Sequence, residues 1–146
     1  EHYLFNKEDK EILDYLESMS GAFDEDESNG ILLVSELNNE IIGTCMLVVE
    51  DIHEQEHSCW RIKNLAVLEN YKRVGCEKKL IEQCMKQVRD LIARKKIASA
   101  KIEVYVAGED KEYLDIYKNV GFKEEGLLKD HYRLDEDTTV LGLVLR

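Results

Sequence analysis

The fold is decided by the stretch between residues 65 and 92, which opens with Leu65-Ala66-Val67 and continues through Tyr71-Lys72-Arg73-Val74-Gly75-Cys76-Glu77-Lys78-Lys79. Behind this turn, apolar residues recur every three or four positions: Leu80, Ile81, Cys84, Met85, Val88, Leu91 and Ile92. That period belongs to an α-helix with one buried face, so a helix is predicted over residues 76–96. The apolar residues before the turn predict a strand from Trp60 to Val67.

The turn between this strand and this helix is suited to an anion. N–H groups in the first turn of a helix have no partner within the helix and lie at the positive end of its dipole. Gly75 permits a close backbone approach, and Lys72, Arg73, Lys78 and Lys79 add positive charge. The same residues also fit a solvent-exposed basic turn without a ligand, and both interpretations stay open at this point.

Upstream of this stretch, the pattern predicts a short strand at residues 3–5 and a helix from Asn6 to Met19, followed by an acidic loop over residues 22–30. Strands are predicted at 31–37 and 40–50. Asn38 and Asn39 between them tolerate the positive φ of a two-residue hairpin turn. Residues 51–58 are predicted to be a polar loop.

Downstream, the alternating residues Ile102, Val104 and Val106 predict a strand. A helix is predicted from a cap at Asp110 to Gly121, which stands in the usual C-terminal glycine position. Strands at 122–128 and 138–145 close the chain. The order β-α-β-β-β-α-β-α-β-β predicts an α+β or α/β fold, with helices on both faces of one sheet, in a single domain over residues 1–146.

Charge is distributed unevenly along the 146 residues, whose formal net charge is −11. Residues 1–60 hold 2 basic and 16 acidic side chains, whereas residues 61–101 hold 12 basic and 4 acidic ones. An acidic chain is unsuited to nucleic acid, which requires a basic surface. The basic island coincides with the turn that could bind an anion, and the acidic segments favour a cationic partner.

The cysteines and the hydropathy indicate a cytoplasmic protein. Cys45, Cys59, Cys76 and Cys84 form no C-x-x-C pair, and three of them lie in apolar-periodic segments, so reduced thiols are expected. No apolar run approaches the ~18 residues of a membrane span. The apolar strand 140–145 is expected to lie centrally in the sheet or at the seam of a homodimer.

In this order, Leu65-Ala66-Val67, Tyr71-Lys72, Gly75 and Ile116-Tyr117-Lys118-Asn119-Val120-Gly121-Phe122 resemble the GNAT superfamily of acyl-CoA-dependent N-acetyltransferases. The family has a strand ending in Leu-Ala-Val and a turn of the form Arg/Gln-x-x-Gly-x-Gly/Ala that opens a helix. A later helix ends in Leu-Tyr-x-x-x-Gly-Phe. The resemblance covers residues 31–128 and implies a mixed, mostly antiparallel twisted sheet of six to seven strands.

The resemblance also implies the site. Acetyl-CoA, with no metal, would lie in a cleft between the strands 59–67 and 101–107, and its pantetheine would pair with the backbone of Leu65, Ala66 and Val67. Its pyrophosphate would bind the turn formed by Lys72, Arg73, Val74, Gly75, Cys76, Glu77 and Lys78. Tyr117 would be the general acid, because a phenol held near the sulfur can protonate the departing thiolate.

Two departures from the family pattern stand out. Glu77 replaces the small last residue of the turn, and a carboxylate ~4 Å from a phosphate oxygen would cost about 4 kcal/mol at an effective dielectric constant near 20. An acid is nevertheless favoured in a first helical turn, where Glu77 can point outward. The strand 60–64 lacks the glutamate that many members use as general base. Glu103, His131 and Tyr132 are substitutes, although each is also an ordinary surface or core residue.

Metal sites are less well supported. His53, His57 and Cys59 are close in sequence but lack the further ligands of a zinc site. Residues 25–36 imitate a calcium loop without the initial aspartate. The favoured hypothesis is therefore an acetyltransferase that acts on a primary amine of a small molecule or peptide, expected to be cationic. The alternative is a catalytically weak or inactive acyl-CoA-binding module of the same fold.

Overall fold

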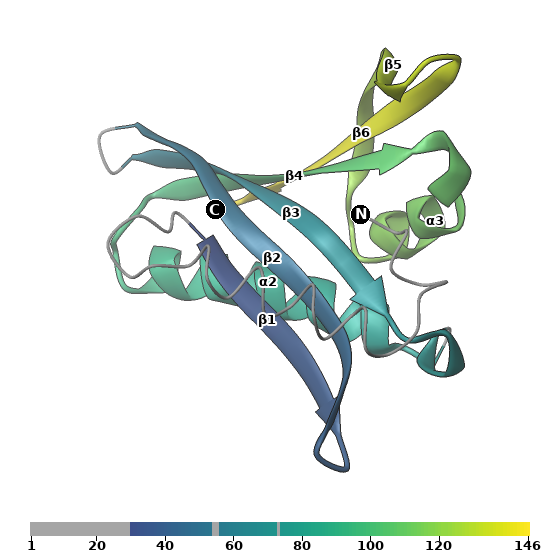
Figure 1. Cartoon of the computed structure of the whole chain (residues 1–146). Helices are drawn as coiled ribbons and strands as arrows, with labels where there is room; N and C mark the ends of the chain where they lie inside the picture. The colour runs from purple at the N-terminus through teal and green to yellow at the C-terminus, as the bar shows by residue number, and fades with distance from the viewer. Residues whose placement is uncertain (1–29, 54–55, 73) are drawn as a thin grey trace.

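The computed structural model describes residues 30–53, 56–72 and 74–146. They form a six-stranded sheet in the order β1-β2-β3-β4-β6-β5, with two α-helices (Figure 1). Only β3 and β4 run parallel; the other neighbouring pairs are antiparallel. The elements are β1 Gly30–Leu37, β2 Glu40–His53, β3 His57–Val67, α2 Cys76–Ala93, β4 Ser99–Ala107, α3 Glu112–Asn119, β5 Lys123–Arg133 and β6 Glu136–Leu145, with short 3-10 turns η2 Glu69–Tyr71 and η3 Gly108–Asp110.

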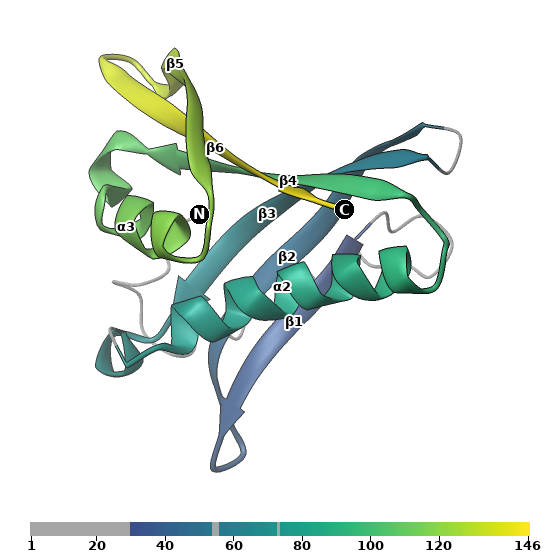
Figure 2. The same ribbon diagram turned by 180° about the vertical axis from the view of Figure 1, so that it is seen from behind.

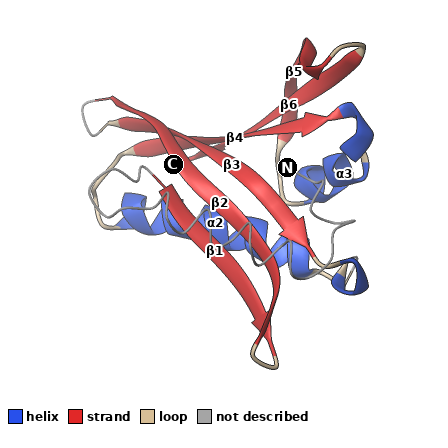
Figure 3. Cartoon of the chain, viewed as in Figure 1, coloured by secondary structure: helices blue, strands red, loops and turns tan. Residues whose placement is uncertain are grey.

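This architecture confirms the predicted fold class: a mixed, mostly antiparallel α+β sheet. The strands form one continuous twisted sheet, and the tip of the β5–β6 hairpin projects beyond the rest of the molecule (Figure 3). The predicted strand at 3–5, the helix at 6–19 and the loop residues 22–29 lie outside the described residues.

Helix α2 packs along the sheet through its apolar stripe, and Figure 2 shows it lying across β1, β2 and β3. The predicted stripe residues Leu80, Ile81, Cys84, Met85 and Val88 are buried, whereas Leu91 and Ile92 at the C-terminal end are half-buried. The helix ends at Ala93, three residues before the predicted limit, because Lys95 adopts a left-handed φ of 55°. The four cysteines are free, and the Sγ atoms of Cys45 and Cys84 lie 3.4 Å apart between β2 and α2.

The predicted hairpin turn is present, whereas several element boundaries differ from the prediction. The hairpin turn at Asn38 and Asn39 has φ values of 51° and 63°, which confirms the expected positive-φ turn. The predicted loop 51–58 is wrong in part, because β2 continues to His53 and β3 begins at His57. Pairing with neighbouring strands extends these polar segments beyond what local propensity indicates. Strands β5 and β6 likewise exceed their predicted lengths, and β6 lies centrally, between β4 and β5.

Gly43 of β2 lets the first turns of α2 approach the sheet. A Cβ atom built there would lie 3.0 Å from the Sγ of Cys76, 3.2 Å from the carbonyl oxygen of Ala66 and 3.2 Å from a methyl group of Leu80. These distances are tighter than ordinary van der Waals contacts, so a methyl group would push α2 away from β2 and β3.

We therefore expect Gly43→Ala to lower the free energy of unfolding by about 1–2 kcal/mol, as overpacked cores do. Urea unfolding followed by circular dichroism measures the change. Gly126→Ala is the matched control, because nothing lies within 4 Å of its added methyl group and its φ is not positive. Equal stability of Gly43→Ala and the wild type would show that α2 can shift at no cost.

Candidate functional site

The parallel strands β3 and β4 separate in the middle of the sheet. Their pairing runs from His57↔Ser99 to Ile62↔Val104 and goes no further in the described part of the chain. Beyond that point, the edge of β3 that faces β4 is unpaired from Lys63 onward, while its other edge still pairs with β2. The opening between the two strands therefore presents backbone N–H and C=O groups to whatever occupies it.

A bulge in β3 lies at the point of separation. The register with β2 shifts between Thr44 and Met46, which pair with Ala66 and Lys63, so two residues of β3 oppose one of β2. Asn64 occupies the bulge with a left-handed φ of 53°. A bulge bends the strand and increases its twist. It thereby turns Leu65, Ala66 and Val67 away from β4, and these three side chains are buried.

The turn between β3 and α2 retains the features of an anion-binding loop. Gly75 has a φ of 91°, caps α2, and has no atom within 4 Å of a Cβ built on it, so the space above it is open. The side chain of Val74 is 70% exposed. Lys72 pairs with Glu69 at 2.8 Å, and Lys78 lies 3.8 Å from Glu82. Cys76 is buried, and Arg73 lies outside the described residues.

Glu77 does not point outward as the sequence suggested. It is only 4% exposed and lines a cavity of about 390 Å³ between the start of α2 and α3. The other lining residues are Lys72, Glu112, Tyr113, Asp115 and Ile116. Helix α3 packs against α2 beside Glu77, so the outward orientation that the sequence allowed is not adopted. The turn at Gly75 therefore borders a cavity lined by three carboxylates and one lysine.

Tyr113 lies at the buried side of this cavity, whereas Glu112 and Asp115 are exposed. Tyr113 is 1% exposed, and burial together with the nearby charge of Glu77 raises the pKa of its phenol far above the usual value. Nearby, burial and the charge of Glu109 raise the pKa of Asp110 to about 6. Asp110 does not cap α3 as predicted: the residue before the helix is Lys111, and no side-chain hydrogen bond caps it.

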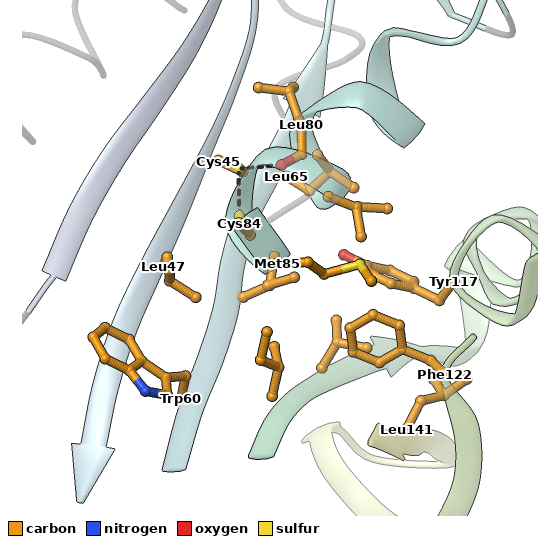
Figure 4. Close-up of a cluster of buried hydrophobic side chains, with 14 of the residues drawn as sticks. Cys45, Leu47, Trp60, Leu65, Leu80, Cys84, Met85, Tyr117, Phe122 and Leu141 are labelled. Atoms are coloured by element: carbon orange, nitrogen blue, oxygen red, sulfur yellow. Dashed lines mark hydrogen bonds between the residues drawn. The ribbon is translucent and has the colours of Figure 1, made fainter. Parts of the chain in front are cut away.

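Tyr117 lies one turn after Tyr113 on α3 and is 1% exposed. Its ring meets Phe122 edge to face, with centroids 5.3 Å apart. Figure 4 shows the hydroxyl end of Tyr117 pointing from α3 toward α2 and the middle of the core. The Tyr-x-x-x-Gly-Phe segment ends α3 and then reverses the chain. Gly121, with a φ of 110°, makes this reversal, which places the ring of Phe122 against that of Tyr117.

A polar cluster lies on the face of β3 and β4 opposite α2, beside the point where the strands separate. The guanidinium of Arg61 stacks over the ring of Tyr105 at 4.0 Å, and one of its nitrogens donates to the Tyr105 hydroxyl at 3.2 Å. Glu50 of β2 lies 3.4 Å from Arg61 and 3.5 Å from Lys63.

Residues of the β5–β6 hairpin extend this outer-face cluster. The ring of His131 lies 5.6 Å from that of Tyr105 and 4.6 Å from that of Tyr132. Of the candidate bases, the structure brings His131 and Tyr132 together, while Glu103 pairs with Lys101 at 3.2 Å. Glu50, Arg61 and Tyr105 were not singled out from the sequence. The available signal was the alternation of side chains along each strand. In β3 it places Arg61 and Lys63 on one face, and in β4 it separates Tyr105 from its buried neighbours Val104 and Val106.

These features suit the pantetheine arm of acetyl-CoA better than its diphosphate. The opening between β3 and β4, with its unpaired backbone edge and buried apolar walls, suits a pantetheine arm. The open space above Gly75 suits a phosphate close to the backbone. The buried carboxylate of Glu77 does not suit a diphosphate, because a buried anion repels a second anion placed beside it.

Comparison with known proteins assigns the family. The Acetyltransferase (GNAT) domain matches residues 28–124, about two-thirds of the chain. The chain belongs to this family. The match covers β1 to β4, both helices, the turn at Gly75 and Tyr117, and the class of activity is acyl-CoA-dependent N-acetyl transfer.

Known relatives of this GNAT domain include acetyltransferases of several kinds. An N-alpha-acetyltransferase of Sulfurisphaera tokodaii is 25% identical, over 82% of this chain and 72% of its own length. Among solved structures, Arabidopsis thaliana NAA60 in complex with a bisubstrate analogue has a TM-score of 0.68 at 16% identity, covering 90% of this chain and 91% of that one. Arabidopsis thaliana Naa50 with the bisubstrate analogue CoA-Ac-MVNAL has a TM-score of 0.66 at 18% identity, covering 77% and 71%.

Two features are absent from the described residues. None of their helices is long and apolar enough to cross a bilayer. Within the same ranges, no group of three or more His, Cys, Asp or Glu side chains is arranged to hold a metal ion.

Proposed function

We propose that this GNAT domain acetylates the α-amine at the N-terminus of a peptide or protein. The observation that carries the proposal is the outer-face cluster around Tyr105, His131 and Tyr132, which lies beside the opening between β3 and β4. An acceptor on that face would reach a thioester in the opening from the side opposite α2. The similarity to an N-alpha-acetyltransferase supports the choice of amine.

The acceptor amine must lose a proton before it attacks. A peptide α-amine has a pKa near 8 and is largely an ammonium ion at neutral pH, which agrees with the cationic acceptor expected from the acidic segments. We assign the acceptance of this proton to His131, since an imidazole can take up a proton at neutral pH. Tyr105 and Tyr132 on either side of it hold the ring by edge-on contacts.

The leaving thiolate requires a proton on the other side of the opening. We assign that proton to the hydroxyl of Tyr117, which lies in the core between α3 and α2 (Figure 4). A buried phenol stays protonated at neutral pH and can donate to the thiolate as the C–S bond breaks. The attacking nitrogen carries an excess proton once its bond to the acetyl carbon has formed, and the loss of this proton restores the phenol. The backbone edge of Leu65, Ala66 and Val67 would orient the thioester arm, because it is unpaired on the side of β4.

Thiol release from acetyl-CoA with a panel of amines tests this function. The panel pairs peptides that have a free N-terminus and no lysine with the same peptides N-formylated, and adds N-formylated lysine peptides and a polyamine. We expect thiol release and a mass gain of one acetyl group only with free N-termini. Acetylation of the lysine peptides or the polyamine would reassign the acceptor. The absence of transfer to every amine would favour the alternative of a non-catalytic acyl-CoA-binding module.

A further inference from the structure

The start of α2 already holds an anion that belongs to the chain itself. Glu77 is the second residue of the helix, and its side chain is 4% exposed rather than solvated. A carboxylate there is favoured by the dipole of an 18-residue helix and by the N–H groups of its first turn. The same helix start would otherwise attract the phosphates of an incoming ligand.

The surroundings of Glu77 are unfavourable to a second anion. The cavity beside it is lined by the carboxylates of Glu77, Glu112 and Asp115, against the single ammonium of Lys72. Burial first and the charge of Glu77 next raise the pKa of the Tyr113 phenol, so the Glu77 carboxylate lies close to a buried group. Glu77 itself is buried, whereas Glu112 and Asp115 are exposed, and a buried charge acts more strongly on a nearby charge than a solvated one does.

The opening between β3 and β4, where the thioester arm would lie, differs from the turn at α2 in the charge of its lining residues. Leu65, Ala66, Val67 and Ala107, on the two sides of the opening between β3 and β4, are all buried and uncharged. Gly75 keeps open space above its backbone. The electrostatic obstacle therefore lies at one end of the donor site only, where the turn enters α2.

We propose that Glu77 occupies the diphosphate position of the donor site, so that the donor is held through its pantetheine arm and its nucleotide diphosphate adds little affinity. This inference rests on the acyl-donor site of the proposed function. It predicts that a pantetheine thioester without the nucleotide is bound about as well as the corresponding coenzyme A thioester. It also predicts that removal of the Glu77 charge restores a preference for the diphosphate.

Calorimetric titration with coenzyme A and with pantetheine tests the proposal without reference to turnover. For the wild type, we expect the two dissociation constants to agree within about threefold. For Glu77→Gln and Glu77→Gly, we expect the ratio of the pantetheine constant to the coenzyme A constant to rise about tenfold or more, as removal of a nearby like charge allows. Asp90→Asn is the matched control, since it removes a negative charge from the far end of α2, where Asp90 pairs with Lys86 at 3.0 Å.

The outcomes separate this inference from the proposed function. A wild type that binds coenzyme A about tenfold or more tightly than pantetheine overturns the inference while leaving the donor site intact. An unchanged ratio in both Glu77 variants also overturns it. If neither compound binds any variant, the donor site and the proposed function fail together with it. Glu77→Gln preserves the volume of the side chain, and thermal unfolding of each variant shows that it is folded.

Discussion

Replacement of Tyr117 by phenylalanine is expected to lower kcat for acetyl transfer by about 100-fold, at the low end of general acid–base effects. KM for the donor should change little, because the ring and its edge-on contact with Phe122 remain. The loss arises because the thiolate must leave without a proton from the hydroxyl. Steady-state thiol release at saturating donor and acceptor measures it.

A control variant and the unfolding midpoint isolate this effect. Lys118→Gln alters the next residue of α3, which is exposed and pairs with Glu124 at 2.9 Å, and it should leave kcat unchanged. The unfolding midpoint of Tyr117→Phe should stay close to that of the wild type. A variant that retains more than about one-third of kcat would show that the proton comes from another group or from water.

Truncation of Leu141 to alanine is expected to produce the largest loss of stability, about 2–5 kcal/mol in the free energy of unfolding. Leu141 is fully buried in β6, where it pairs with Val104 of β4. Figure 4 places it in the same cluster as Phe122 and Tyr117. The substitution removes three carbons from the interior and leaves a cavity that the rigid central strands cannot close.

Denaturant titration measures this loss, and Val144→Ala on the same strand is its control. Val144 is 51% exposed, so its truncation should change stability by no more than about 0.5 kcal/mol. The denaturant dependence of the unfolding free energy should be the same for both variants, because neither alters the surface exposed on unfolding. Similar stability losses in the two variants would contradict the central position of β6 in the core.

Much of the architecture could be predicted because it depends on local periodicity. The apolar stripe of α2 from Leu80 to Val88 follows a 3.6-residue period that only a helix can place on one side. The turn at Asn38 and Asn39 follows from the tolerance of asparagine for positive φ. The pattern around Gly75 and from Tyr117 to Phe122 was specific enough to indicate the family that the comparison later assigned.

The candidate site could be predicted only where it is formed by consecutive residues. Leu65, Ala66, Val67 and Gly75 belong to one stretch of chain, so their proximity follows from sequence order. The cluster of Glu50, Arg61, Tyr105 and His131 draws on four strands, and its contacts depend on strand order and register. The alternation of polar and apolar residues within one strand indicates neither the order of the strands nor their register.

The sequence by itself determined which turn leads into the start of α2, which residues form the apolar face of that helix, and which family the chain resembles. The tertiary structure alone decided what lies against that turn. Glu77 is acidic and stands where an exposed acid is common, yet α3 covers it and Tyr113 packs nearby. The physical reason is that periodicity reports how polar each face of an element is. Whether a charged side chain is solvated depends on the neighbouring element, and tertiary packing brings that element into place.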